Sequence, residues 1–276
     1  MDRYIFVLLV SILSLLLSEP ALAEVLIQDA RSNVFTSDMS FDNARIPTGS
    51  GDEGDYELIV CGVTNDGPTQ FSPPFPDGWT ELDNGPCGRD NCTLGLWGRF
   101  TDDPASEDII CNWSPDTSVF AAGSFRYRNV DPVDPIIDVA CDSGFDFAPN
   151  VTAIAPSIET EPGSQVAVFF VYRNVDDDTT NSVSDNDNFE GLFFSAAALD
   201  FANIFAVGFT ILFPSGGATP VFPLDTGTDS EWRACTVALR MAPDSRNVPA
   251  LSEWGLIGFA AVAGIAGLWF LKRLFE

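Results

Sequence analysis

The 276-residue sequence contains no histidine, a single lysine and only 13 basic residues in all, against 40 acidic ones. Without histidine, Ser-His-Asp and Cys-His catalysis, HExxH zinc sites and histidine-ligated haem are excluded. The formal charge of −27 excludes the basic surface that contact with nucleic-acid phosphates requires, so we expect no nucleic-acid partner. Hydrophobic residues make up 46% of the chain and include 23 phenylalanines. This composition predicts a folded protein rather than a disordered acidic one.

The first 23 residues have the pattern of an export signal. One base, Arg3, precedes an apolar run from Ile5 to Leu17, and the small residues Ala21 and Ala23 follow. A run of 13 residues is short for a membrane span, whereas the Ala-x-Ala pattern suits signal peptidase. We therefore predict that residues 1–23 are a signal peptide that is removed after Ala23.

A second apolar segment, residues 256–271, lies near the C-terminus and is followed by Lys272 and Arg273. As a helix, the stretch from Trp254 to Leu271 is about 27 Å long, which matches the hydrocarbon core of a bilayer. The basic pair acts as a membrane stop and keeps the tail, residues 272–276, on the cytoplasmic side. We therefore predict a transmembrane helix at 256–271, with the body of the protein outside the cytoplasm.

Residues 244–255 join the body to this helix and contain a distinctive motif: Val248, Pro249, Ala250, Leu251, Ser252, Glu253, Trp254 and Gly255. Together with the helix and the basic pair, the motif resembles the IPTL-type C-terminal sorting signal, a relative of the PEP-type signals read by exosortases. The resemblance implies that a membrane-embedded sorting transpeptidase cuts near the motif and that the body then moves to the cell surface. Val248 and Ala250 depart from the usual Ile and Thr. The alternative is an ordinary membrane anchor behind a proline-bounded linker.

Residues 24–243 carry almost all of the negative charge and have the pattern of β-strands. Short apolar runs alternate with clusters of Gly, Pro, Asn and Asp, and no long segment has the helical period. The clearest runs are Tyr56 to Val63, Leu94 to Phe100, Asp108 to Trp113, Ser118 to Tyr127, Gln165 to Tyr172, Ala206 to Phe213 and Trp232 to Met241. Leu192 to Phe205, with three consecutive alanines, is ambiguous between strand and helix. We predict one all-β domain, an antiparallel two-sheet sandwich.

Several stretches of this body resemble the ordered landmarks of a jelly-roll-like sandwich found in bacterial and phage surface proteins. They are GDYELIV from Gly54, PDGWT from Pro76, LGLWGR from Leu94, FRYRNVD from Phe125 and WRACTVALR from Trp232. The resemblance implies a single jelly-roll-like domain and carries no defined activity.

Six cysteines lie in the exported body: Cys61, Cys87, Cys92, Cys111, Cys141 and Cys235. An even number behind an export signal predicts disulfides formed in an oxidising compartment. Cys87 and Cys92 enclose only four residues, so we predict that they pair. The other four permit three pairings, which the sequence does not distinguish. A zinc site is disfavoured because no CxxC spacing occurs.

An acidic segment contains four aspartates at alternating positions, Asp176, Asp178, Asp185 and Asp187. Oxygen ligands at such spacing suit Ca²⁺, although the Gly and terminal Glu of an EF-hand loop are missing. The pattern favours a solvated acidic loop, with a calcium site as the alternative. We expect no other cofactor and no other metal.

The predicted function is that of a non-catalytic surface protein serving adhesion, matrix formation or envelope structure. One alternative is a glycoside hydrolase, for which two facing carboxylates suffice. The candidate acids are Asp102, Asp103, Glu107, Asp108 and Glu231. Another alternative is a carbohydrate-binding module that stacks surface polysaccharide on exposed rings; its candidates are Trp79, Trp97, Trp113 and Trp232. No acid is marked out by its neighbours, and Trp in a sandwich is more often part of the core.

Overall fold

A computed structural model of the chain describes residues 26–47, 50–64, 70–75, 77–102, 108–147, 151–174, 191–199, 202–227 and 230–243. The chain divides into two compact units, residues 1–242 and residues 243–276. The predicted signal peptide, sorting motif, transmembrane helix and basic tail all lie outside the described residues. Within the described residues, no helix has the length and apolar character needed to cross a bilayer.

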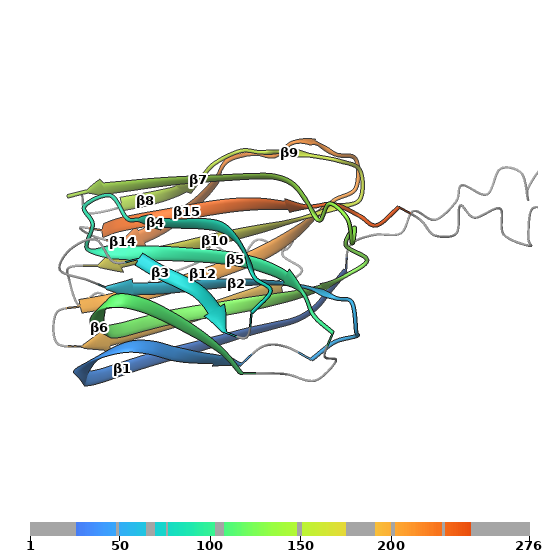
Figure 1. The fold of residues 1–276 in the computed structure, drawn as a ribbon. Helices are drawn as coiled ribbons and strands as arrows, with labels where there is room; N and C mark the ends of the chain where they lie inside the picture. Colours follow the sequence, from blue (N-terminus) through green and yellow to red (C-terminus); the bar gives the residue numbers. More distant parts are fainter. Residues whose placement is uncertain are drawn as a thin grey trace, which may run out of the picture. The chain divides into compact units, whose positions relative to one another are not determined.

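The first unit is built from two large antiparallel sheets and two small ribbons (Figure 1). The first sheet has the order β1 (Leu26–Pro47), β6 (Asp108–Arg128), β2 (Tyr56–Thr64), β5 (Cys92–Phe100) and β4 (Thr80–Pro86), with β3 (Gln70–Phe75) paired to β6. The second sheet has the order β11 (Gly191–Leu199), β12 (Ala202–Phe213), β10 (Ser164–Asn174), β15 (Ser230–Leu239) and β7 (Ile136–Asp146). One ribbon pairs β8 (Val151–Ala155) with β14 (Phe222–Gly227), and the other pairs β9 (Glu159–Thr160) with β13 (Gly217–Ala218). The prediction of an antiparallel all-β domain is confirmed.

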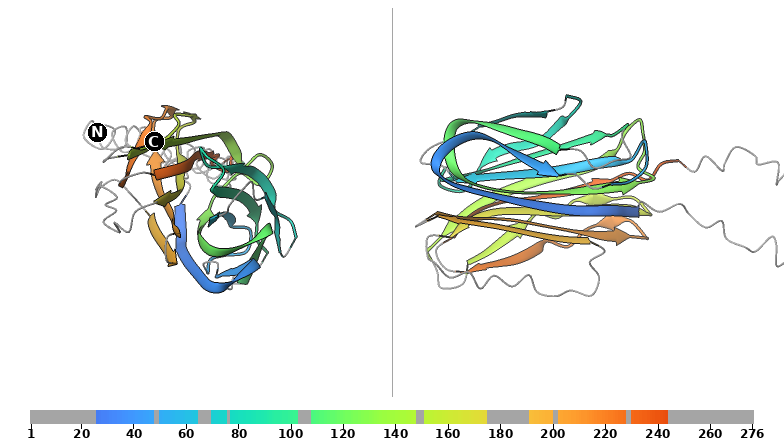
Figure 2. Two further views of the ribbon diagram at one scale, coloured as in Figure 1. Left: turned by 90° about the vertical axis from the view of Figure 1, so that its left-hand side faces the viewer. Right: turned by 90° about the horizontal axis from the view of Figure 1, so that it is seen from below.

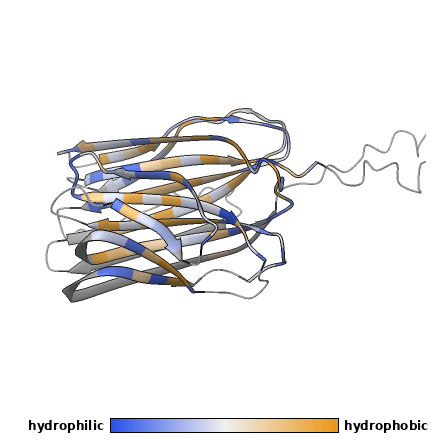
Figure 3. Cartoon of the chain, viewed as in Figure 1, coloured by the Kyte–Doolittle hydropathy of each residue, from blue (hydrophilic) through white to orange (hydrophobic). Residues whose placement is uncertain are grey.

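The main core lies between the facing sides of the two large sheets. Leu58 and Leu96 from the first sheet and Phe169 and Val237 from the second are fully buried there. Hydrophobic residues follow the strands of both sheets (Figure 3). This arrangement is sandwich-like, because two sheets each bury one face against the other.

Each large sheet also buries much of its other face. The first sheet curves in the end-on view of Figure 2, and the first halves of β6 and β3 help to enclose a second core that contains Ile59, Trp97 and Trp113. The second sheet is covered by the β8–β14 ribbon over a third core. All nine residues of β2 are buried as a result. This explains why the strand reads as a continuous apolar run rather than as an alternating one.

The structure settles one segment that the sequence left open and corrects another. The ambiguous alanine-rich segment is extended, in β11 and the start of β12. The two expected strands between Asp108 and Tyr127 are parts of one strand, β6, because β1 pairs with it along both halves. The two small ribbons were not predicted.

The chain passes from the first large sheet to the second once, through residues 129–135, since β1 to β6 lie in the first sheet. This crossing segment is fastened to the end of β15: Ala242 N donates to Asn129 O at 2.7 Å and Asp131 N donates to Arg240 O at 2.9 Å. Leu26, where β1 begins, is paired with Arg128 just before the crossing. The first and last described segments therefore lie at the same end of this unit.

Three disulfides join the cysteines as Cys61–Cys111, Cys87–Cys92 and Cys141–Cys235. The predicted Cys87–Cys92 pair is confirmed, and the pairing of the other four, which the sequence left open, is settled. Cys61–Cys111 ties β2 to the curved part of β6, and Cys141–Cys235 joins neighbouring strands of the second sheet. Three disulfides indicate an extracytoplasmic domain.

Candidate functional site

The structure describes three of the five candidate hydrolase acids, and two of these three are paired with arginines. Glu231 is 1% exposed and pairs with Arg173, at 3.4 Å between Oε1 and Nη1. Asp108 is exposed and lies 3.4 Å from Arg45. Asp102 is exposed in a bend after β5. The remaining two candidates, Asp103 and Glu107, lie outside the described residues.

Glu231 and Asp102 lie near opposite ends of β5. The Sγ of Cys92, the first residue of β5, is 3.9 Å from the Glu231 carbonyl oxygen, whereas Asp102 follows the last residue, Phe100. A strand rises about 3.3 Å per residue, so these two acids are separated by roughly 30 Å. Glycoside hydrolysis requires carboxyl groups within about 10 Å of each other. This pair cannot act together on one glycosidic bond.

The candidate tryptophans do not form a row on the surface. Trp97, Trp113 and Trp232 are 0%, 3% and 8% exposed. Trp113 stacks on Phe120, with ring centroids 5.1 Å apart, and Phe71 meets both Trp97 and Trp113 edge to face. Trp79 is half-buried, with the Arg99 guanidinium 4.5 Å from its ring centroid. Three of the four rings are core residues, and the face of the fourth, Trp79, is covered by the Arg99 guanidinium.

The predicted acidic loop with Asp176, Asp178, Asp185 and Asp187 lies outside the described residues, as do the sorting motif and the membrane stop. The solvated loop, the calcium site and the sorting signal therefore stay predictions.

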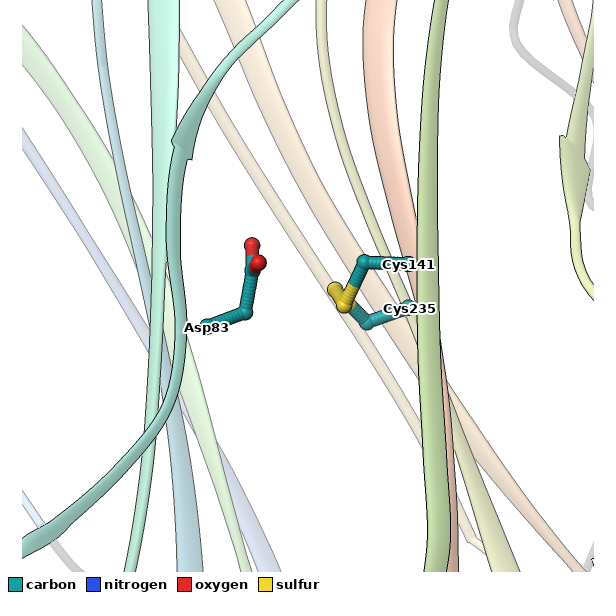
Figure 4. Close-up of side chains that lie close together, drawn as sticks. All are labelled: Asp83, Cys141 and Cys235. Carbon is teal, nitrogen blue, oxygen red and sulfur yellow. A yellow bond between two sulfur atoms is a disulfide. The ribbon is translucent and has the colours of Figure 1, made fainter.

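Asp83, Cys141 and Cys235 bring potential metal-ligand atoms together, within 4.8 Å of one another (Figure 4). The two sulfurs form a disulfide, and a metal requires thiolates. The Asp83 carboxylate already accepts hydrogen bonds from Arg233 Nε at 2.5 Å and Nη2 at 2.6 Å. A Cβ on Gly85 would lie 2.4 Å from the Arg233 Cζ, so a larger residue there would force the guanidinium to shift. This cluster is an ion pair between the two large sheets rather than a metal centre.

One pocket, with a volume of about 450 Å³, lies where the end of the first sheet meets the start of β7. It is lined by Tyr56, Gly78, Thr80, Leu82, Phe100, Asp134, Pro135 and Ile136. Tyr56 and Phe100 meet edge to face with centroids 4.8 Å apart. Burial raises the pKa of the Tyr56 hydroxyl, so it stays protonated at neutral pH.

The charge at this pocket is neutralised. Asp134 forms an ion pair with Arg240, whose Nε lies 3.4 Å from Glu161 Oε2. The hydrogen bond to Asp134 raises the pKa of Arg240. Asp134 is the one carboxylate among the eight lining residues. The pocket is thus suited to an apolar group, and its lining provides no second acid for proton transfer.

A buried charge cluster among the described residues is one that sequence reasoning missed. Glu57 in β2 lies between Arg99 in β5 and Arg126 in β6, because the register places both directly opposite it. Arg99 Nε and Nη2 both donate to Glu57 Oε2 at 3.2 Å, and Arg126 Nη1 lies 3.6 Å from Oε1. Arg126 Nε also donates to Asp55 at 3.3 Å. The available signal was a charged residue inside the apolar run of β2.

The cluster joins three neighbouring strands through buried ion pairs. Its side chains are at most 8% exposed, and each acid is held by an arginine. Desolvation by burial raises the pKa of Asp55 in spite of the neighbouring Arg126. Breaking one partner of a buried ion pair leaves an uncompensated charge, so the cluster makes the alignment of β5, β2 and β6 specific.

The chain was compared with protein-family models, curated proteins and solved structures, and none of them matches it.

Proposed function

We propose that this chain is a non-catalytic exported surface protein that is sorted through its C-terminal segment and serves adhesion, matrix or envelope structure. The observation that carries the proposal is the set of three disulfides, in a body flanked by an export signal pattern and a motif-helix-basic pattern. Disulfides persist in oxidising compartments, which agrees with export. The partners are then the membrane and a sorting transpeptidase.

The absence of catalysis is supported by how the candidate residues are used. Glu231 is neutralised by Arg173, and three of the four candidate tryptophans are in the cores. The acidic body, which lacks histidine, is suited to staying soluble and apart from its neighbours at high surface density.

We also propose, from the resemblance of the sequence landmarks, that the domain is jelly-roll-like. Two facing antiparallel sheets support this assignment. Among the described strands the chain passes between the two large sheets once, at residues 129–135, so the likeness lies in the two facing sheets rather than in the strand order.

The sorting proposal is tested in the producing cells by fractionation and intact-mass analysis of the protein. The mature chain should begin after Ala23, lack residues 256–276 and occur in the outer-surface or medium fraction. Its mass should also be lower than that of the reduced chain by six hydrogen atoms, because each of the three disulfides forms with the loss of two.

A Pro249→Ala variant changes the motif, and Pro243→Ala is the matched control outside it. The motif variant should accumulate uncut in the inner membrane, while the control is processed normally. If the native protein retains Phe270 to Glu276 in its final location, the sorting proposal fails and a permanently anchored β domain is left.

A further inference from the structure

Strand β7 ends the five-stranded sheet, and in the described part of the chain it pairs only with β15. An unpaired edge presents backbone N–H and C=O groups that another strand can extend, so a β domain that stays monomeric has to protect it. The 11 residues of β7 include Val139, Ala140 and Cys141, all partly exposed.

The register shows which backbone groups face the open side. Cys141 lies opposite Cys235 with a Cα–Cα distance of 4.1 Å. This short spacing marks a non-hydrogen-bonded pair, in which the N–H and C=O point away from the partner strand. Val139 and Ser143 lie two residues to either side, opposite Val237 and Arg233, with no register shift between them. Their backbone groups therefore point outward as well.

Two aspartates of β7 accept hydrogen bonds from two of these outward-facing amides. Val139 N donates to Asp138 Oδ1 at 2.9 Å, and Ser143 N donates to Asp142 Oδ1 at 2.8 Å. A side chain that accepts the hydrogen bond of a backbone amide competes directly with strand pairing.

Both ends of the β7 edge are covered by other segments. At one end, Glu159 N donates to the second oxygen of Asp138 at 3.1 Å. At the other end, a Cβ on Gly88 would lie 2.4 Å from the Gly144 carbonyl carbon, so the β4–β5 turn packs directly on the β7 backbone. Arg89 in the same turn lies 3.6 Å above the Phe145 ring centroid. The edge is accessible mainly between Val139 and Ser143, where the aspartate caps lie.

We propose that Asp138 and Asp142 block this edge against strand addition, and that the partner they exclude is β7 of a second copy of the chain. An antiparallel pair with its two-fold axis at Cys141 places Val139 of one copy opposite Ser143 of the other. The two capped amides are thus among those that such a dimer would use, on either side of the Cys141 amide. The same pairing brings aspartates of both copies onto one face, where like charges repel.

The test is self-association of the full chain, purified in detergent, with the double substitution Asp138→Ala and Asp142→Ala. The matched control is Glu53→Ala with Asp77→Ala, two exposed acids elsewhere, which changes the net charge equally. Light scattering across a concentration series measures the association constant, and hydrogen exchange with mass spectrometry locates the protected amides. We expect the variant to self-associate at least about tenfold more strongly than the control. Its protection at residues 139–143 should increase with protein concentration.

Several outcomes overturn the proposal: no association by a folded variant, equal association by the control, or protection away from β7. If the double variant does not fold, Asp142→Ala alone is used, since Asp142 is exposed. Its Ser143 amide should then exchange faster than in the unchanged chain at low concentration and more slowly at high concentration. Unchanged exchange of Ser143 in that variant also overturns the proposal.

Discussion

The three disulfides should contribute to stability in the order of the loops that they close. Their sequence separations are 5 residues for Cys87–Cys92, 50 for Cys61–Cys111 and 94 for Cys141–Cys235. The loss of loop-closure entropy in the unfolded chain then corresponds to about 2.1, 4.1 and 4.7 kcal/mol at 25 °C. Only the smallest loop lies within another, so the three values should be nearly additive.

The assay is urea unfolding of three variants, each with one cysteine pair replaced by alanine. Alanine avoids placing a hydroxyl in the cores, where Cys61, Cys111 and Cys235 are all fully buried. Removing the Cys87–Cys92 disulfide should therefore lower the free energy of unfolding least, and removing Cys141–Cys235 should lower it most.

Substitution also removes packed sulfur, and this effect needs its own control. The single variant Cys111→Ala loses the same disulfide as the variant with Cys61→Ala and Cys111→Ala. The difference between the two measures the packing of the second sulfur, and Cys92→Ala and Cys235→Ala give the same correction for the other two disulfides. After this correction, a cost for Cys87–Cys92 equal to or above that for Cys141–Cys235 would refute the loop-entropy reasoning.

Three further predictions concern the cores and the buried charges. Glu57→Gln should destabilise the fold by about 3 kcal/mol in chemical denaturation, because two arginine side chains lose their shared carboxylate; a change near zero contradicts this role. Trp97→Ala should cost about 3–5 kcal/mol, whereas Val133→Ser, at a residue 90% exposed, should stay within about 0.5 kcal/mol; similar losses in both would disprove the assigned burial. Burial raises the pKa of Asp55 from its ordinary value of 3.8, so its stabilising contribution is complete below that value and is lost as the pH rises through the folded-state pKa. The change in the free energy of unfolding caused by Asp55→Asn, measured in urea, should therefore be more stabilising, or less destabilising, at pH 7 than at pH 3. The opposite trend would show that the attraction to Arg126 outweighs the desolvation of Asp55.

Strand positions were predictable where local sequence determines them. Continuous apolar runs such as Tyr56 to Val63, bounded by turn residues, indicate strands whatever they pack against. The continuity of β6 was not predictable in this way. Its two halves form one strand because both pair with β1, which is distant in the sequence. The β8–β14 ribbon was missed for a similar reason: its strands are short, and they are defined by the sheet that they cover.

The sequence by itself determined the absence of histidine chemistry, the all-β class and the Cys87–Cys92 disulfide, since each depends on residues that are close together in the chain or on simple counts. Only the tertiary structure decided that Cys61 pairs with Cys111, that Glu57 lies between Arg99 and Arg126, and that Asp138 caps an open edge. Those contacts arise from strand order and register, which depend on how distant segments pack. A shift of one residue in register would turn each of these side chains to the other face of its sheet.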